Sequence, residues 1–242
     1  MLSKKEAKDI QSLGLKKNRE ESGLFVAEGP KIVSELLEHS AASIVSIYAT
    51  DLWLNDHRDK IGNVTVHPVT ESELQRISQL QTPNQVVAIC RQFVETLPDN
   101  NAFTLYLDRI QDPGNFGTII RVADWFGVPQ IVCSSGCADV YNSKVVQSTM
   151  GSIARVNVYY EREINWLAQQ ASTIYAATLH GKPLQDFEKT RSGVLLIGNE
   201  SKGLSVSVLE TATEQITIQR RGAAESLNAA VATGIILSHL LK

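Results

Sequence analysis

Residues 195–204 read LLIGNESKGL, an apolar run that leads directly into a polar loop with two glycines. An uninterrupted apolar run is typical of a strand that is buried on both faces, and we predict this one over residues 194–197. Five similar strand candidates lie in the same part of the chain, at residues 103–107, 130–133, 156–160, 173–178 and 215–218. Helices fit between most of them. Strands that alternate with helices predict an α/β fold with a parallel sheet covered on both faces.

The loops that follow these strands are the candidate sites, because such sheets bind ligands beyond the carboxyl ends of their strands. The loop at residues 108–117 contains Asp-Pro-Gly-Asn, a tight turn by residue chemistry. Asn115 is the predicted N-cap of a helix over residues 118–126. Arg121 lies off the buried stripe of that helix, so we expect its guanidinium to point into the cleft. Taken alone, a capped turn followed by a solvated arginine explains the segment equally well.

The loop at residues 198–204 follows the strand with which we began. Its two glycines allow a ligand to approach the backbone closely. Glu200 stands where a cationic or hydroxyl-bearing ligand would be met. An ordinary turn with an exposed glutamate is the alternative interpretation.

The loop before the final helix carries a third group of polar side chains. Ser226 is the predicted N-cap of a helix over residues 226–241, whose free N–H groups favour an anionic ligand. Asn228 projects from the first turn, and Arg220 and Arg221 offer phosphate contacts. A capped helix after a basic loop is again the alternative.

The N-terminal part has shorter alternating elements. The pattern predicts one polar helix over residues 3–13, strands at 24–27, 43–49 and 85–90, a helix that starts at Pro30, and a capping box at residues 70–73 before another helix. The polar stretch 95–101 contains a proline and breaks the pattern. We therefore predict a small α/β domain over residues 1–97 and a larger one over residues 98–242.

Charge is distributed unevenly along the 242 residues, although the formal net charge is only −3. Residues 1–19 carry six basic and two acidic side chains, whereas residues 20–97 carry five basic and eleven acidic ones. The basic N-terminal arm therefore stands out as a possible nucleic-acid contact, and a solvated helix face is the alternative.

Several classes of protein are excluded by what the sequence lacks. It has no run of 18 apolar residues and no apolar N-terminal core, so we expect a cytoplasmic protein that does not enter a membrane. The three cysteines and five histidines form no spacing typical of a zinc site. The absence of G-x-G-x-x-G, of G-x4-G-K-[ST] and of G-x-S-x-G argues against a Rossmann dinucleotide site, a P-loop and a serine hydrolase.

Taken together and in this order, the three loops resemble the motifs of the SpoU/TrmH branch of the SPOUT superfamily, which are RNA ribose 2′-O-methyltransferases. The resemblance covers residues 103–242. Its motifs are Asn115-x5-Arg121 with Ala123-Asp124-x2-Gly127-Val128, then Ile197-Gly198-Asn199-Glu200-x2-Gly203-Leu204, then Gly222-x2-Glu225-Ser226-Leu227-Asn228-x2-Val231-Ala232. Residues 18–37 also resemble the substrate-binding domain found upstream of many of these enzymes, which is similar to the ribosomal protein L30e.

The resemblance implies a SPOUT fold with a deep trefoil knot, a homodimer, and S-adenosyl-methionine bound on the knotted loops without a metal. The cofactor-binding positions that it implies are Thr178, Leu179, Gly181, Ile197, Gly198, Asn199, Glu200, Gly203, Ile218, Ser226, Leu227 and Asn228. The sequence departs from the family where Gln219 and Arg220 replace the usual Pro-Met and where Gln147 replaces a frequent arginine. These departures bear on the choice of substrate more than on the reaction.

The family also assigns the catalytic role to Arg121, supported by Asn115, Glu200, Ser226 and Asn228. Because arginine stays protonated, we expect Arg121 to grip the phosphate beside the target ribose while the phosphate or a water accepts the proton. Glu200 would orient Arg121 or the hydroxyl. The RNA-binding candidates are Lys16, Lys17, Arg19, Arg109, Arg121, Lys144, Arg220 and Arg221.

Other functions remain open at this point. Ribosomal RNA is the favoured substrate because of the upstream domain, and transfer RNA is the alternative. A base instead of a ribose as methyl acceptor, and a non-catalytic RNA-binding protein with a degenerate methyltransferase domain, are further possibilities. An unrelated oxidoreductase is disfavoured by the missing glycine fingerprint.

Overall fold

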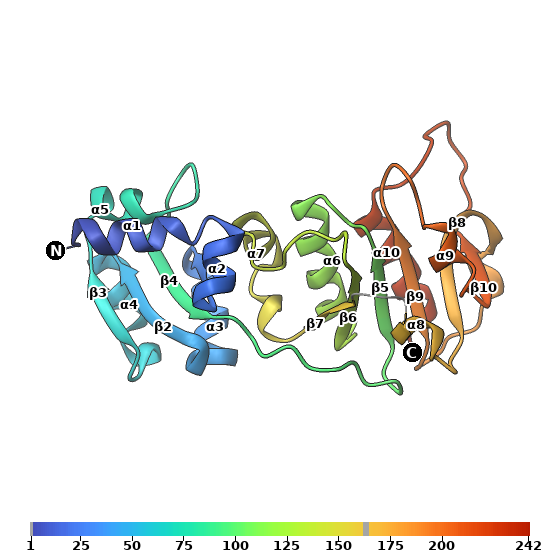
Figure 1. Cartoon of the computed structure of the whole chain (residues 1–242), viewed down its shortest axis with the longest axis horizontal. Helices are drawn as coiled ribbons and strands as arrows, with labels where there is room; N and C mark the ends of the chain where they lie inside the picture. Colours follow the sequence, from blue (N-terminus) through green and yellow to red (C-terminus); the bar gives the residue numbers. More distant parts are fainter. Residues whose placement is uncertain (1, 162–164) are drawn as a thin grey trace. The chain divides into compact units, whose positions relative to one another are not determined.

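A computed structural model describes residues 2–161 and 165–242, which form two compact units. The first unit consists of Met1–Val94 and Asp139–Ala154, and the second of Glu95–Ala138 and Arg155–Lys242. The ranges predicted from sequence, 1–97 and 98–242, differ from these units at residues 95–97, which belong to the second unit, and at residues 139–154, which belong to the first. Figure 1 shows the whole chain coloured along the sequence.

The first unit contains a four-stranded sheet in the order β1-β4-β2-β3. Its strands are β1 Leu24–Glu28, β2 Ile44–Ala49, β3 Thr65–Pro68 and β4 Val86–Arg91. β4 runs antiparallel to both β1 and β2, whereas β3 pairs parallel with β2 and forms an edge. Three of these strands were predicted; the short β3 was not, because only its central residues Val66 and His67 are even half-buried.

Helices cover both faces of this sheet. On one face, the apolar sides of α1 and α5 share a core with Val26, Val87 and Ile89 of the strands. On the other face, α3 packs on the strands and on α4. The helical segments of the unit are α1 Lys4–Ser12, α2 Lys16–Ser22, α3 Pro30–Ser40, η1 Ala41–Ser43, α4 Asp51–Ile61, α5 Glu71–Ile77, α7 Ser143–Thr149 and η2 Ser152–Ala154.

Two local predictions for this unit are confirmed and one needs correction. Pro30 is in the first turn of α3, and Thr70 and Glu73 form the predicted capping box of α5. The basic N-terminal segment is not a free arm, since its second half forms the additional helix α2. Residues 139–154 join the unit because the Tyr141 ring packs on Phe25, with ring centroids 4.9 Å apart, and α7 packs on β1.

The second unit contains a six-stranded, entirely parallel sheet in the order β10-β8-β9-β5-β6-β7. Its strands are β5 Thr104–Asp108, β6 Gln130–Ser134, β7 Asn157–Glu161, β8 Ile174–Pro183, β9 Val194–Gly198 and β10 Glu214–Thr217. All six predicted strands are present, and the predicted α/β fold with a parallel sheet is confirmed. β8 is longer than expected.

Helices again cover both faces of the sheet. On one face, α6 packs against α10 and on β6, and α10 also contacts β9. On the other face, Tyr106, Leu196 and Val208 belong to a core shared with Leu167 of α8. The helical segments are α6 Pro113–Trp125, α8 Asn165–Ala168, η3 Leu184–Asp186, α9 Val206–Leu209 and α10 Ala229–Leu240. None of the helices in the described ranges is long and apolar enough to cross a membrane.

The pairing of β8 with its neighbour β10 is interrupted by a shift in register. Gln215 pairs with Ala176, but the next residue, Ile216, pairs with Lys182. Five residues of β8, 177–181, therefore leave the ladder. A Cβ atom at Gly181 would lie 2.4 Å from the carbonyl carbon of Gln215, so only glycine fits where the two strands meet again.

Candidate active site

The predicted functional loops leave the sheet of the second unit at neighbouring positions. β10, β8, β9 and β5 are adjacent and parallel, so their carboxyl ends lie along one edge. The 177–181 excursion and the loops after β5, β9 and β10 therefore gather there, although they span more than a hundred residues of sequence. This is the edge where sheets of this class bind ligands.

A chain of hydrogen bonds joins all three motifs. Asn228 accepts from the backbone N–H groups of Ala230 and Val231 through its Oδ1, at 3.0 and 3.2 Å. Its Nδ2 therefore donates, and it does so to Oδ1 of Asn115 at 2.7 Å. Nδ2 of Asn115 in turn donates to Oε1 of Glu200 at 2.7 Å. The two amides thus hold the carboxylate of Glu200 at a fixed place at the sheet edge.

Both predicted N-caps lie elsewhere than expected. The N-cap of α6 is Asp112, which accepts from the backbone N–H of Asn115 at 2.7 Å, and Pro113 begins the helix. The N-cap of α10 is Asn228 and not Ser226, which is exposed in the preceding loop. In both motifs the sequence offers several capping residues in a row, and the pattern cannot tell which one the chain uses. The correction frees Asn115 for the contact with Glu200.

Arg121 points away from this cluster. It follows Asn115 by six residues, so it is rotated by roughly 240° around α6, and it is exposed. Within the described part of the chain, no hydrogen bond or ion pair joins Arg121 to Glu200. The Glu200 carboxylate instead accepts a hydrogen bond from Asn115. Within one chain Glu200 therefore does not orient Arg121, and its roles toward an Arg121 of a second subunit or toward the hydroxyl stay predictions.

Asn199 closes the loop that follows β9. Its backbone exchanges two hydrogen bonds with Gly203, and its Oδ1 accepts from the N–H groups of Ser201 and Lys202. Its Nδ2 donates to the carbonyl oxygen of Arg109, which ties this loop to the one after β5. The loop turns back so tightly that a Cβ atom at Gly198 would lie 2.4 Å from the Gly203 carbonyl carbon. All the polar groups of Asn199 therefore serve the shape of the loop.

Asp108, which the sequence interpretation did not single out, connects three of the loops. This carboxylate ends β5, is only 2% exposed, and accepts from the backbone N–H of Ser205 at 2.6 Å. The Ser134 hydroxyl at the end of β6 lies 3.4 Å away, and Nε of Arg109 lies 3.2 Å away. The sequence feature that could have identified Asp108 is a carboxylate at the end of a buried strand, directly before an arginine.

Arg109 has an unusual backbone as well. Its φ of +57° is left-handed, and its N–H donates to Ser134 at 2.9 Å. Half-buried beside Asp108, Arg109 fixes the start of the loop that carries Asn115. Its predicted role in RNA binding stays a prediction.

The positions predicted to hold the cofactor provide a suitable lining at the same edge. Thr178 lies in the 177–181 excursion, and its hydroxyl is buried without a hydrogen-bond partner in the described residues. Leu179 and Leu227 are 65% and 47% exposed, which is unusual for leucine and suits contact with an apolar ring face. Ile197 is buried, and Ile218 is half-buried. An unsatisfied hydroxyl and exposed apolar side chains on adjacent loops fit an adenosine moiety.

The RNA-binding candidates fall into different environments. Lys16 and Lys17 are exposed on α2 and form i,i+4 pairs with glutamates. Arg19 is only 3% exposed; its guanidinium donates to the carbonyl oxygens of Leu13 and Gly14 and pairs with Asp139. The prediction that Arg19 contacts RNA is therefore wrong, because its charge is used inside the first unit.

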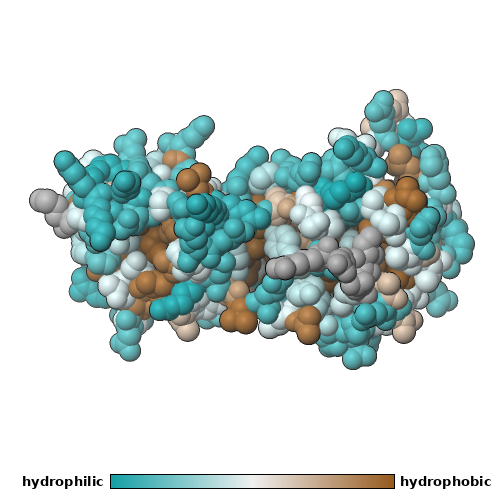
Figure 2. Space-filling view, in the orientation of Figure 1, coloured by the Kyte–Doolittle hydropathy of each residue, from teal (hydrophilic) through white to brown (hydrophobic). Residues whose placement is uncertain are grey.

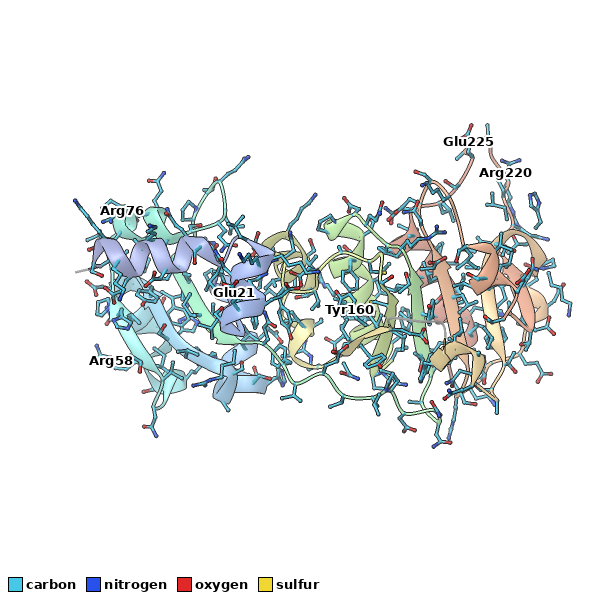
Figure 3. All side chains as sticks on the ribbon, viewed as in Figure 1. Glu21, Arg58, Arg76, Tyr160, Arg220 and Glu225 are labelled. Atoms are coloured by element: carbon cyan, nitrogen blue, oxygen red, sulfur yellow. The ribbon has the colours of Figure 1, made fainter. Side chains whose placement is uncertain are left out.

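The remaining basic candidates are exposed. Lys144 lies on α7 of the first unit. Arg220 and Arg221 lie in the long loop between β10 and α10, where Figure 3 shows Arg220 and Glu225 on a projecting segment. No group of three or more His, Cys, Asp or Glu side chains among the described residues is arranged to hold a metal ion.

Comparison with known proteins agrees with this arrangement. The SpoU rRNA Methylase family matches residues 102–238, and the MRM3-like substrate binding domain matches residues 4–88. The 23S rRNA (guanosine(2553)-2'-O)-methyltransferase RlmP of Bacillus subtilis (strain 168) is 31% identical over 96% of this chain and 94% of its own length.

Solved structures are similar over the whole chain. A protein of the TrmH family from Porphyromonas gingivalis has a TM-score of 0.88 and 35% identity, and covers 98% of this chain and 97% of its own. The AdoMet-bound rRNA methyltransferase of Sinorhizobium meliloti has a TM-score of 0.84 and 31% identity, with 98% and 94% covered. The chain therefore belongs to the SpoU rRNA methylase family.

Proposed function

We propose that this protein transfers a methyl group from S-adenosyl-methionine to a ribose 2′-hydroxyl of ribosomal RNA. The observation that carries the proposal is the hydrogen-bonded series Glu200–Asn115–Asn228, which joins the three family motifs at the ligand-binding edge of the parallel sheet. The similar rRNA methyltransferases, one of them with bound AdoMet, support the substrate and the cofactor.

The cofactor supplies a methyl group on a sulfonium, which is transferred as a C–O bond forms and the C–S bond breaks. The loops around Thr178, Gly198 and Leu227 hold it and keep the reacting atoms aligned. Glu200, fixed by Asn115, accepts a hydrogen bond from the ribose hydroxyl and orients its oxygen. The adjacent phosphate or a water then takes the hydroxyl proton, since Arg121 stays protonated.

Arg121 grips the phosphate beside the target ribose and, in our proposal, does so across a homodimer. Arg121 and the exposed Trp125 are four residues apart and share one side of α6. The adjoining helix α10 leaves Val231 and Ile235 exposed. These side chains form the proposed dimer face, which would place Arg121 of one subunit beside the Glu200 cluster of the other. Only one side of the molecule is visible in Figure 2, where hydrophobic patches interrupt a mostly hydrophilic surface.

Basic side chains of both units contact the phosphate groups of the RNA. Lys16, Lys17 and Lys144 on the first unit, and Arg220 and Arg221 on the second, are the proposed phosphate contacts. The trefoil knot and the assignment of the two predicted ranges as functional domains remain part of this proposal. We also propose that the protein acts on ribosomal RNA in the cytoplasm.

The test is incubation with total RNA and methyl-labelled cofactor, followed by mapping of the labelled nucleotide by nuclease digestion and mass spectrometry. We expect the label on one ribose of ribosomal RNA. Label on transfer RNA would change the substrate, label on a base would change the acceptor, and no label together with no binding of the cofactor would refute the proposal.

Arg121→Ala tests the mechanism. We expect at least a hundredfold loss of methyl transfer, because one group that stabilises and orients the phosphate is removed, while the affinity for S-adenosyl-methionine stays within about twofold. Lys189→Ala, which removes another cation of the second unit, is the matched control. Methyl transfer by Arg121→Ala at the normal rate would show that the role is wrongly assigned.

A further inference from the structure

Two of the three cysteines lie at the carboxyl end of β6, outside the family motifs. Cys133 is the last residue but one of this strand and is fully buried, whereas Cys137 is half-buried in the loop that follows. The backbone N–H of Cys137 donates to the carbonyl oxygen of Ser134 at 3.1 Å, so the loop turns back on the end of its own strand. Both thiols are free.

The turn brings the two sulfur atoms together. Sγ of Cys137 donates to the carbonyl oxygen of Leu107 at 3.1 Å, and Leu107 is the direct neighbour of Cys133 in the parallel ladder of β5 and β6. The Cys133 thiol also forms a hydrogen bond with the Cys137 sulfur. The two thiols are therefore adjacent, with Cys137 on the side that solvent reaches.

The environment makes the two thiols chemically different. The hydrogen bond from the Cys133 thiol lowers the pKa of Cys137 below its ordinary value, helped by the backbone N–H of Ile110 and opposed by burial. Burial raises the pKa of Cys133 well above its ordinary value. Because the thiolate is the nucleophile in thiol chemistry, Cys137 is the thiol suited to attack and Cys133 the one suited to respond.

The loop between the two cysteines holds a neighbouring loop of the candidate active site. The Ser134 hydroxyl accepts from the backbone N–H of Arg109 at 2.9 Å, and a Cβ atom at Gly136 would lie 2.8 Å from Cγ of Arg109. On its other side, the carbonyl oxygen of Arg109 accepts from Nδ2 of Asn199 at 2.9 Å. Arg109 is thus held between the cysteine loop and the loop after β9, which belongs to the proposed cofactor site.

We propose that Cys133 and Cys137 are a redox-sensitive pair that closes into a reversible disulfide, and that closure moves Arg109 and weakens cofactor binding. The oxidant is a small-molecule disulfide of the glutathione type. In a reducing compartment the pair is then open by default and closes only transiently, as is usual for disulfides of intracellular proteins.

The reaction is a thiol–disulfide exchange in two steps. The Cys137 thiolate attacks one sulfur of the small disulfide; the new S–S bond forms as the old one breaks, and one small thiolate leaves. Cys133 then loses its proton and its sulfur attacks the Cys137 sulfur, which displaces the second small thiolate. The protein loses two S–H bonds and gains one S–S bond, and the oxidant is reduced to two thiols.

The thiol chemistry is independent of the proposed function, whereas its effect on the cofactor rests on that proposal. The full chain is incubated with oxidised or with reduced glutathione, denatured, alkylated and weighed by mass spectrometry. We expect three alkyl groups on the reduced chain and one on the oxidised chain, because two of the three cysteines have paired. Peptide mapping should place the bond between Cys133 and Cys137, and reductant should restore all three thiols.

Calorimetry on the same two samples before denaturation measures the consequence for the site. We expect the oxidised chain to bind S-adenosyl-methionine at least about fivefold more weakly than the reduced chain, the lower end of usual coupling between sites.

Three variants assign the roles of the thiols. Cys133→Ala keeps a small apolar side chain in the core and removes the second thiol, so we expect a lasting glutathione adduct on Cys137. Cys137→Ser keeps a donor for Leu107, and we expect it to leave Cys133 unmodified. Cys90→Ala is the matched control: Cys90 is buried in the first unit, where burial raises its pKa to about 12, and its loss should leave the disulfide unchanged.

The outcomes separate the parts of the inference from each other and from the function. Three free thiols in the oxidised wild type, or a glutathione adduct that no internal disulfide replaces, would overturn the pair. An adduct on Cys133 in Cys137→Ser would overturn the assigned roles, and equal affinities of the oxidised and reduced chains would overturn the link through Arg109. If the reduced chain does not bind S-adenosyl-methionine at all, the proposed function fails, while the thiol counts still decide whether the pair exists.

Discussion

A buried carboxylate ends a strand in each unit, and the two are used differently. Glu28 ends β1 and is 4% exposed; it accepts from the Ser78 hydroxyl and from the backbone N–H of Gln79. Asp108 ends β5 and accepts from the backbone N–H of Ser205 beside the guanidinium of Arg109. Glu28 fastens one connecting loop, whereas Asp108 fastens the loops that carry the site.

The difference follows from the two sheets. In the mixed sheet of the first unit, β1 lies beside the antiparallel strand β4, which ends at the opposite edge, so the end of β1 meets few other loops. In the parallel sheet of the second unit, every strand ends at the same edge, and Asp108 can reach the loops after β6 and β9. Chemistry that needs residues from distant parts of the sequence is therefore built on the second sheet.

The largest effect is expected from removing Asp108. Asp108→Ala leaves the Ser205 N–H and the half-buried Arg109 without their acceptor, so we expect the second unit to lose about 2–4 kcal/mol of unfolding free energy. Binding of S-adenosyl-methionine should weaken at least tenfold, because the loop after β9 is released. Denaturant titration and calorimetry measure the two effects.

Asp186→Ala is the control for Asp108→Ala, since Asp186 is an exposed carboxylate of the same unit and should change the unfolding free energy by less than about 0.5 kcal/mol. If Asp108→Ala behaves like this control, Asp108 does not fasten the loops and the contrast with Glu28 disappears.

A smaller effect is expected within the cluster of amides. Asn228→Ser keeps an N-cap on α10 but removes the amide that donates to Asn115, and Asn115→Ala removes the partner. In a double-mutant cycle on methyl transfer we expect a coupling of about 1 kcal/mol, since the two residues act on Glu200 together. Asn142→Ser, the same change at the N-cap of α7, is the control. Strictly additive losses would show that Asn115 and Asn228 act independently.

The strands of the second unit could be predicted from the sequence because a strand that is buried on both faces appears as a continuous apolar run. The six apolar runs form six strands, and the carboxyl-edge rule pointed to the segments whose Asn115, Glu200 and Asn228 are joined by hydrogen bonds. The partners within the site could not be predicted. Whether Glu200 meets Asn115 or Arg121 depends on the rotation of α6, and therefore on Asp112 being its N-cap.

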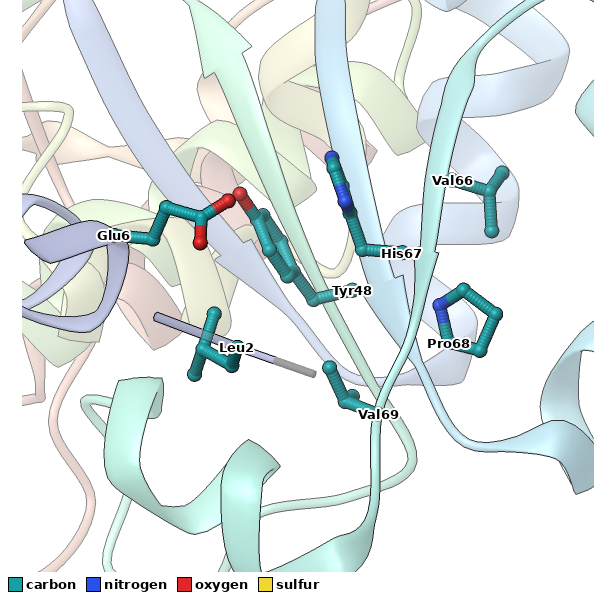
Figure 4. A pocket seen from close by; sticks show the side chains of 7 residues that line it. All are labelled: Leu2, Glu6, Tyr48, Val66, His67, Pro68 and Val69. Atoms are coloured by element: carbon teal, nitrogen blue, oxygen red, sulfur yellow. The ribbon is translucent and has the colours of Figure 1, made fainter. Parts of the chain in front are cut away.

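In the first unit, too, contacts between distant segments of the chain could not be predicted from the sequence. Arg19 looks like part of a basic segment, but the turn between α1 and α2 presents the carbonyl oxygens of Leu13 and Gly14 to it, and Asp139 comes from much later in the chain. The stacked rings of Tyr48 and His67 (Figure 4) depend on the pairing of β2 with β3, and the weak pattern of β3 did not indicate a strand. Contacts between distant segments decide both cases.

The smallest effect in the comparison is the pH dependence that Glu28 gives to stability. Burial raises the pKa of Glu28 above its ordinary value of 4.5, against the opposing hydrogen bonds from Ser78 and Gln79. The folded state therefore binds the proton more tightly than the unfolded state, so the contribution of Glu28 is fully present below pH 4.5 and is lost as the pH rises through the raised pKa. The unfolding free energy of the wild type minus that of Glu28→Gln should fall over this interval, whereas Ser78→Ala, which removes a hydrogen bond to the charged form, should steepen the fall. Denaturant titrations at several pH values measure the difference, and a difference that stays constant or rises with pH would mean that Glu28 is not held in a desolvated site.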